Sequence, residues 1–135
     1  KDDSILYKFS EENNLLLPSD IDHSPHFDST REQLGIHKCD VAIRECTDEL
    51  SGLAFQGPLS ATVLDVMGFD NVELIKPFEV VEVPFAGSVI YLARMGFTAD
   101  LGYECWFEPS MAHEFSTRIE RVRRKLGKNI PRIWS

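Results

Sequence analysis

The sequence predicts an α+β fold with antiparallel or mixed sheets, helices on one face and a ferredoxin-like second half. Short runs rich in apolar, β-branched and aromatic residues recur along the chain, separated by turns that contain glycine or proline. Two later segments instead have apolar residues at helical spacing. The length of 135 residues suits one sizeable core. We therefore expect one compact unit, built from a β-β-α-β segment (1–50) and a ferredoxin-like β-α-β-β-β-α segment (51–135).

The first segment opens with two strand-like runs, residues 4–9 and 14–17. The polar residues 10–13 lie between these runs and are typical of a turn. Together they predict a β-hairpin.

A short helix and another strand are predicted after the hairpin. Ser24 supplies a capping hydroxyl and is followed by proline, so the helix is expected to start there and to end at Gly35. Residues 40–45 alternate apolar and polar side chains, which predicts a half-buried strand.

The second segment begins with a strand, a tight turn and a helix. Residues 53–55 read as a buried strand that stops at a Gln-Gly-Pro turn, and residues 59–67 carry helical spacing before Gly68. Strand-like runs follow at residues 77–85, 88–93 and 103–107. These runs predict a sheet.

A final helix is predicted to start at Ser110, whose hydroxyl is expected to cap it. Its apolar residues fall on one face: Phe115, Ile119, Val122 and Leu126. Basic residues cluster toward its C-terminal half, where the helix dipole favours positive charge. A solvated face accounts for these charges better than an anion-binding site does.

Composition excludes several classes of function. There are 22 acidic and 14 basic residues, and the net charge of -8 disfavours binding to a nucleic-acid backbone. The sequence contains no apolar run long enough to span a membrane. The 3 cysteines and 4 histidines lack the spacing of metal ligands, and an odd number of cysteines suits reduced thiols in the cytosol. We expect a soluble, cytoplasmic protein without a metal site.

Two segments together carry a recognisable pattern. Residues 53–60 read Leu-Ala-Phe-Gln-Gly-Pro-Leu-Ser, and residues 92–106 place a loop with Gly96 and Gly102 between two strands. The combination resembles the glycine-cleavage T-protein (aminomethyltransferase) family of folate-dependent one-carbon enzymes. Members show a Leu-Gln-Gly-Pro turn and, downstream, Gly-Tyr-Thr-Gly-Glu-x-Gly-x-Glu. The resemblance covers most of the chain and implies the folate-binding midsection of a longer polypeptide.

This chain keeps the second motif in part. Residues 96–104 read Gly-Phe-Thr-Ala-Asp-Leu-Gly-Tyr-Glu, so both glycines, the threonine and the final glutamate are present. Phe97 replaces the family's tyrosine, and Ala99 with Asp100 replaces Gly-Glu. The chain also begins like family members, with two aspartates before a strand ending in tyrosine. Since it starts with lysine and has no signal peptide, we expect the native start upstream.

The resemblance assigns Glu104 to the pterin ring of tetrahydrofolate. This ring presents an amino group and a ring N–H side by side, which one carboxylate can accept together. Alternation along the strand places Glu104 and Trp106 on one face, so an acid and an aromatic side chain could line one pocket. Spacing alone favours a solvent-facing glutamate, since strand faces routinely expose acids. The family match favours the folate role.

The resemblance implies three further site residues. Asp3 is the expected catalytic group, because a carboxylate near the folate nitrogens can hold the attacking amine and stabilise developing positive charge. Without the resemblance, Asp3 would read as a loose terminal charge. Phe97 is expected to give apolar contact to folate, and Tyr7 to lie beside the ligand. A core position is the alternative for both aromatic residues.

The donor of the one-carbon unit is left open. Aminomethyl transfer is the first choice, with a lipoyl carrier protein as the partner that the resemblance implies. Residues 17–22, Leu-Pro-Ser-Asp-Ile-Asp, look closer to folate-dependent demethylases such as those acting on dimethylsulfoniopropionate. A third alternative is a non-catalytic folate-binding or interaction module. A piece cut from its neighbours would also expose apolar patches, which favour self-association.

Overall fold

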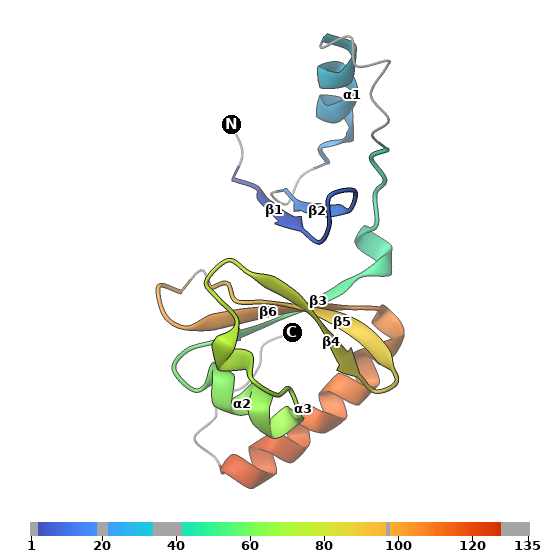
Figure 1. Ribbon diagram of the computed structural model, residues 1–135. Helices are drawn as coiled ribbons and strands as arrows, with labels where there is room; N and C mark the ends of the chain where they lie inside the picture. The colour runs from blue at the N-terminus through green and yellow to red at the C-terminus, as the bar shows by residue number, and fades with distance from the viewer. Residues whose placement is uncertain (1–2, 19–21, 34–41, 97, 128–135) are drawn as a thin grey trace. The chain divides into compact units, whose positions relative to one another are not determined.

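The computed structural model describes residues 3–18, 22–33, 42–96 and 98–127 (Figure 1). The chain divides into two units, residues 1–45 and 46–135, and each is described by itself. The α+β class is confirmed, because the described residues form α-helices and two antiparallel sheets. That both segments pack as one compact unit stays a prediction. Within the described residues, the helices are too short or too polar to cross a membrane.

The first unit contains the predicted hairpin. Strand β1 (Ile5–Lys8) pairs antiparallel with β2 (Asn14–Leu17), and Tyr7 lies opposite Leu15. Both of these side chains are buried. Ser10 Oγ accepts hydrogen bonds from two backbone N–H groups of the turn, at 3.2 and 3.0 Å. The hairpin prediction is therefore confirmed.

Helix α1 (Ser24–Gln33) begins where the sequence predicts. At its start, Asp22 Oδ1 accepts the Ser24 backbone N–H at 2.9 Å. Hydrogen bonds from Ser24 lower the pKa of Asp22. The predicted end of this helix at Gly35 lies outside the described residues.

The strand predicted over residues 40–45 is wrong for its described part. Residues 42–45 have no regular secondary structure, and Ile43 is 53% exposed. Alternation in so short a stretch forms a strand only where a neighbouring strand supplies hydrogen bonds and an apolar face. None of the described strands pairs with this stretch.

The second unit follows the predicted order β-α-β-β-β-α. Its elements are β3 (Ser51–Gln56), α2 (Ser60–Met67), β4 (Val80–Phe85), β5 (Ser88–Ala93), β6 (Gly102–Phe107) and α3 (Ala112–Leu126). Its sheet has the strand order β3-β6-β5-β4, and each neighbouring pair is antiparallel. The second unit thus resembles a ferredoxin-like fold in the order of its strands and helices along the chain.

The sequence predicts the end of α2 correctly but not the start of α3. Gly68 ends α2 as predicted, with φ at +98° and its N–H bonded to the Asp65 carbonyl at 2.9 Å. The predicted Ser110 cap of α3 is wrong, because a 3-10 turn (Pro109–Met111) precedes the helix. The Ala112 N–H, which a capping Ser110 hydroxyl would have accepted, donates to the Pro109 carbonyl instead, so the backbone itself supplies this bond.

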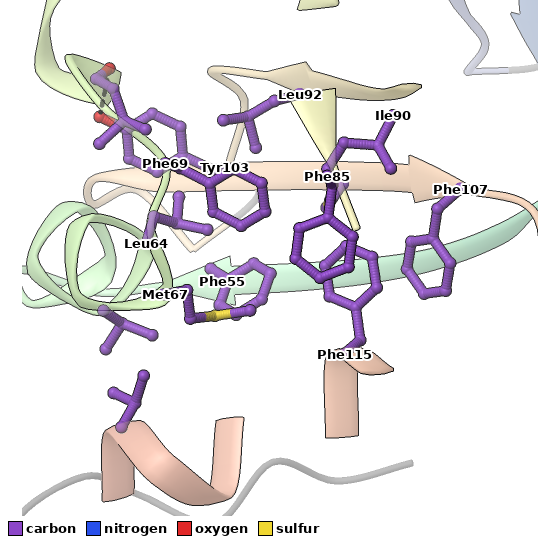
Figure 2. Packing of buried hydrophobic residues seen from close by; sticks show 14 of the residues in the cluster. Phe55, Leu64, Met67, Phe69, Phe85, Ile90, Leu92, Tyr103, Phe107 and Phe115 are labelled. Atoms are coloured by element: carbon purple, nitrogen blue, oxygen red, sulfur yellow. Dashed lines mark hydrogen bonds between the residues drawn. The ribbon is translucent and has the colours of Figure 1, made fainter. Parts of the chain in front are cut away.

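Helices α2 and α3 pack on the same face of the sheet (Figure 1). Figure 2 shows the resulting core, in which Phe115 of α3 lies among sheet residues. Its ring stacks on Phe85 and Phe107, with centroids 4.1 and 4.0 Å apart. The Tyr103 hydroxyl donates to the Val72 carbonyl at 3.2 Å, which satisfies this buried polar group. Burial against aromatic rings joins α3 to the sheet.

Replacing Phe115 with alanine is expected to lower the free energy of unfolding by about 3–5 kcal/mol, because it leaves a cavity between the two rings. Urea denaturation followed by circular dichroism measures this change. The exposed neighbour Ser116 offers a control, since Ser116→Ala is expected to change stability by less than about 0.5 kcal/mol. Equal stabilities for the two variants would contradict this account of the core.

Candidate functional site

Glu104 and Trp106 lie on the sheet face opposite the helices. Along β6 their neighbours Tyr103, Cys105 and Phe107 are buried in the core, whereas Glu104 and Trp106 are half-buried. The predicted alternation is confirmed. The acid and the aromatic ring therefore share one face, two residues apart on one strand.

Small residues flank Glu104 on both neighbouring strands. Ala54 of β3 and Ala93 of β5 lie directly opposite it in the two ladders. Directly opposite residues of an antiparallel pair share a sheet face, with Cβ atoms about 4.5–5.5 Å apart. Since each of these neighbours carries only a methyl group, no bulky side chain lies directly opposite the carboxylate in either ladder.

Trp106 packs against Gly52. The two residues are opposite each other in the β3–β6 ladder, and a Cβ at Gly52 would lie 2.6 Å from Trp106 Cζ3 and 3.1 Å from Cη2. The indole ring therefore occupies the space that any other residue would need at position 52.

The Trp106 indole N–H is buried and has no hydrogen-bond partner in the part of the chain that the structure describes. A buried donor left unpaired costs about 1–3 kcal/mol. Such groups in native proteins ordinarily find an acceptor in a water molecule or a ligand. The same strand face therefore carries the Glu104 carboxylate and, beneath the surface, an indole N–H that no described residue accepts.

Cys105 lies behind this face, in the core. It is fully buried, and desolvation raises the pKa of its thiol to about 12. A thiol that stays protonated is neither a nucleophile nor a metal ligand at neutral pH. Among the described residues, there is no group of three or more His, Cys, Asp or Glu side chains placed to hold a metal ion.

The two motif segments contact each other although they are far apart in the sequence. The Gly57 N–H donates to the Leu101 carbonyl at 2.7 Å, and Ser60 Oγ lies 3.4 Å from the same oxygen. Gln56 bonds to the same loop: Thr98 Oγ1 donates to its Oε1 at 3.2 Å. The Gln-Gly-Pro turn therefore anchors the loop that leads into β6, a role that the sequence pattern did not reveal.

Within this loop, Ala99 has a φ of +58°. This left-handed conformation strains residues with a Cβ and favours glycine. Glycine is the residue of the resembled motif at this position, so the substitution keeps the turn at some cost in strain. The loop conformation explains why the motif carries glycine there.

The other predicted site residues are placed differently. Asp3 is exposed and lies two residues before the start of β1, and Tyr7 lies on β1 with 3% of its surface exposed. Both belong to the first unit, whereas Glu104 belongs to the second. Burial of Tyr7 is what its core alternative requires, and a role beside a ligand stays a prediction. Phe97 lies outside the described residues.

Comparison with known protein families gives a match that covers most of the chain. Residues 1–128 match the family described as the GCVT N-terminal domain. The chain belongs to this family. The match includes both units and both motif segments, so the resemblance drawn from the motifs is confirmed.

Relatives within the family agree. The aminomethyltransferase of Thermoanaerobacter pseudethanolicus is 28% identical over 127 residues, covering 93% of this chain and 34% of that protein. The Chlorobaculum tepidum enzyme is 32% identical over 104 residues, 76% of this chain and 28% of that protein. A probable aminomethyltransferase of Aeropyrum pernix is 29% identical over 133 residues, 94% and 35% respectively. The chain spans about a third of the length of these relatives.

Burial of Cys105 predicts strong protection from thiol reagents. In a Cys39→Ser, Cys46→Ser background, the native chain at pH 8 is expected to react at least on the order of a thousandfold more slowly than the unfolded chain, given a pKa of about 12 in the fold. The fold favours the neutral thiol over the thiolate. Burial of Cys105 therefore stabilises the folded chain fully at pH values below the unfolded pKa near 9.0, and this stabilisation is lost as the pH rises toward 12. Equal labelling rates with and without urea would contradict this.

Proposed function

We propose that this chain forms part of a tetrahydrofolate-dependent one-carbon transferase of the aminomethyltransferase type. Membership of the family and the names of the relatives support this proposal. The observation that carries it is the place of Glu104, a half-buried carboxylate between two alanines on the sheet face away from the core.

The groups on this face fit the chemistry of a pterin. Glu104 can accept hydrogen bonds from an adjacent amino group and ring N–H, which a pterin presents together. Trp106 is half-buried on the same face, two residues along the strand from Glu104. Its flat indole also offers an aromatic surface for stacking.

Asp3 is the proposed catalytic group. Bound tetrahydrofolate supplies the nitrogen atoms that take up the one-carbon unit. The exposed Asp3 carboxylate would hold the attacking amine in place and stabilise the positive charge that develops beside it. Tyr7 and Phe97 are proposed to contribute apolar contacts to the ligand.

The donor and partner follow from the same proposal. An aminomethyl group carried on the lipoyl arm of a carrier protein is the proposed donor, in a cytosolic glycine-cleavage reaction. The names of the relatives favour this donor over the methyl donors of the demethylase alternative. Since those relatives are about three times as long, the transfer step is a property proposed for a polypeptide of that length.

The test of the pterin site is titration calorimetry with tetrahydrofolate. Glu104→Gln is expected to weaken binding on the order of 10- to 100-fold, because it removes a charge-assisted pair of hydrogen bonds. Glu82, an exposed acid on β4 on the same face, serves as a matched control, and Glu82→Gln is expected to bind as the wild type does. A wild-type chain that folds but binds no tetrahydrofolate would overturn the proposal, as would equal binding by both variants.

The test of catalysis is a transfer assay on the longer polypeptide. Asp3→Asn is expected to lower the rate of aminomethyl transfer to tetrahydrofolate on the order of 100-fold and to leave the Kd for tetrahydrofolate unchanged. The amide keeps the size of the side chain but not its charge. Transfer from dimethylsulfoniopropionate in place of the aminomethyl donor would show that the donor is wrong, and an unchanged rate would remove Asp3 from the mechanism.

A further inference from the structure

Gln56, the last residue of β3, lies beside the loop that leads into β6. It is directly opposite Gly102 in the ladder and shares the sheet face of Glu104. Its side chain bridges both sides of the loop: Nε2 lies 3.5 Å from the Met95 carbonyl, and Oε1 accepts the Thr98 hydroxyl at 3.2 Å. One half-buried amide thus contacts the loop at two points.

The two glycines of the motif make room for this amide. A Cβ at Gly96 would lie 2.7 Å from Gln56 Oε1 and 3.1 Å from the Asp100 carbonyl. A Cβ at Gly102 would overlap Oε1 and lie 2.8 Å from the amide carbon and nitrogen. Neither glycine has a positive φ, so backbone conformation does not require them. In the observed arrangement, the Gln56 amide occupies the space that a Cβ at either position would enter.

A second anchor of the loop is independent of the Gln56 side chain. The Gly57 N–H bonds to the Leu101 carbonyl at 2.7 Å, and the β3–β6 ladder continues to Gly102. A variant at position 56 therefore keeps the backbone attachment of the loop. What it loses is the exact placement of the strand end two residues before Glu104.

Resting on the proposed function, we infer that Gln56 is a positioning residue of the folate site, which acts on the ligand through Glu104. Its amide contacts Met95 and Thr98 just before β6, and these contacts set where the Glu104 carboxylate lies relative to the two pterin donors. Binding groups lose affinity when their supporting contacts allow shifts of about 0.5 Å or more. Gln56 itself need not touch the ligand.

A double-mutant cycle on tetrahydrofolate affinity tests this role. The variants are Gln56→Ala, Glu104→Gln and the two combined, measured by calorimetry, with urea denaturation to follow stability. Gln56→Ala is expected to weaken binding roughly tenfold. The combined variant is expected to bind no more weakly than Glu104→Gln, because residues that act through one contact are not additive. Gln33→Ala, at the exposed end of α1, is the control.

A second variant guards against a simple loss of folding. Gln56→Glu keeps the size of the side chain and an oxygen for Thr98 but cannot donate to the Met95 carbonyl, so it is also expected to weaken binding roughly tenfold. Additive losses in the cycle, or wild-type affinity for both Gln56 variants, would overturn the inference and leave the proposed function standing. If the wild type has no affinity for tetrahydrofolate, or if Glu104→Gln does not change that affinity, both the proposed function and the inference are overturned.

Discussion

The burial of Tyr103, Cys105 and Phe107 against the aromatic rings around Phe115 is the constraint on which the second unit depends. Side chains alternate along a strand, so burying these three residues turns Glu104 and Trp106 to the opposite face. A shift of one residue in the β6 register would exchange the two sets and place a carboxylate in the core. Core packing and placement of the candidate site therefore have the same cause.

The contact between the two motif segments depends on that register as well. With Gln56 opposite Gly102, the end of β3 lies beside the loop that enters β6, and the Gln-Gly-Pro turn meets the Leu101 carbonyl. Gly96 and Gly102 look like generic loop residues in the sequence. In the structure, they leave space for the amide side chain of Gln56. Gly52 likewise leaves space for the indole ring of Trp106.

Family membership and local chemistry both support the proposed folate site. Residues 1–128 match the GCVT N-terminal domain, and the sequence motif on which the resemblance rests ends in Glu104. The buried indole N–H beside it is a feature of this chain that the motif does not specify. The half-buried Glu104 carboxylate, flanked by two alanines, gives the folate proposal its physical content, independently of the names of the relatives.

The sequence by itself determined the α+β class, the hairpin, the order of elements after residue 50 and the face of Glu104, because hydrophobic periodicity and glycine or proline stops are local signals. The same signals were wrong for residues 42–45 and for the Ser110 cap, where strand pairing and a backbone turn at Pro109 decide the outcome. Only the tertiary structure brought Gln56 to Gly96 and Gly102. Contacts between residues about forty positions apart depend on strand pairing, and no local pattern encodes the partner of a strand.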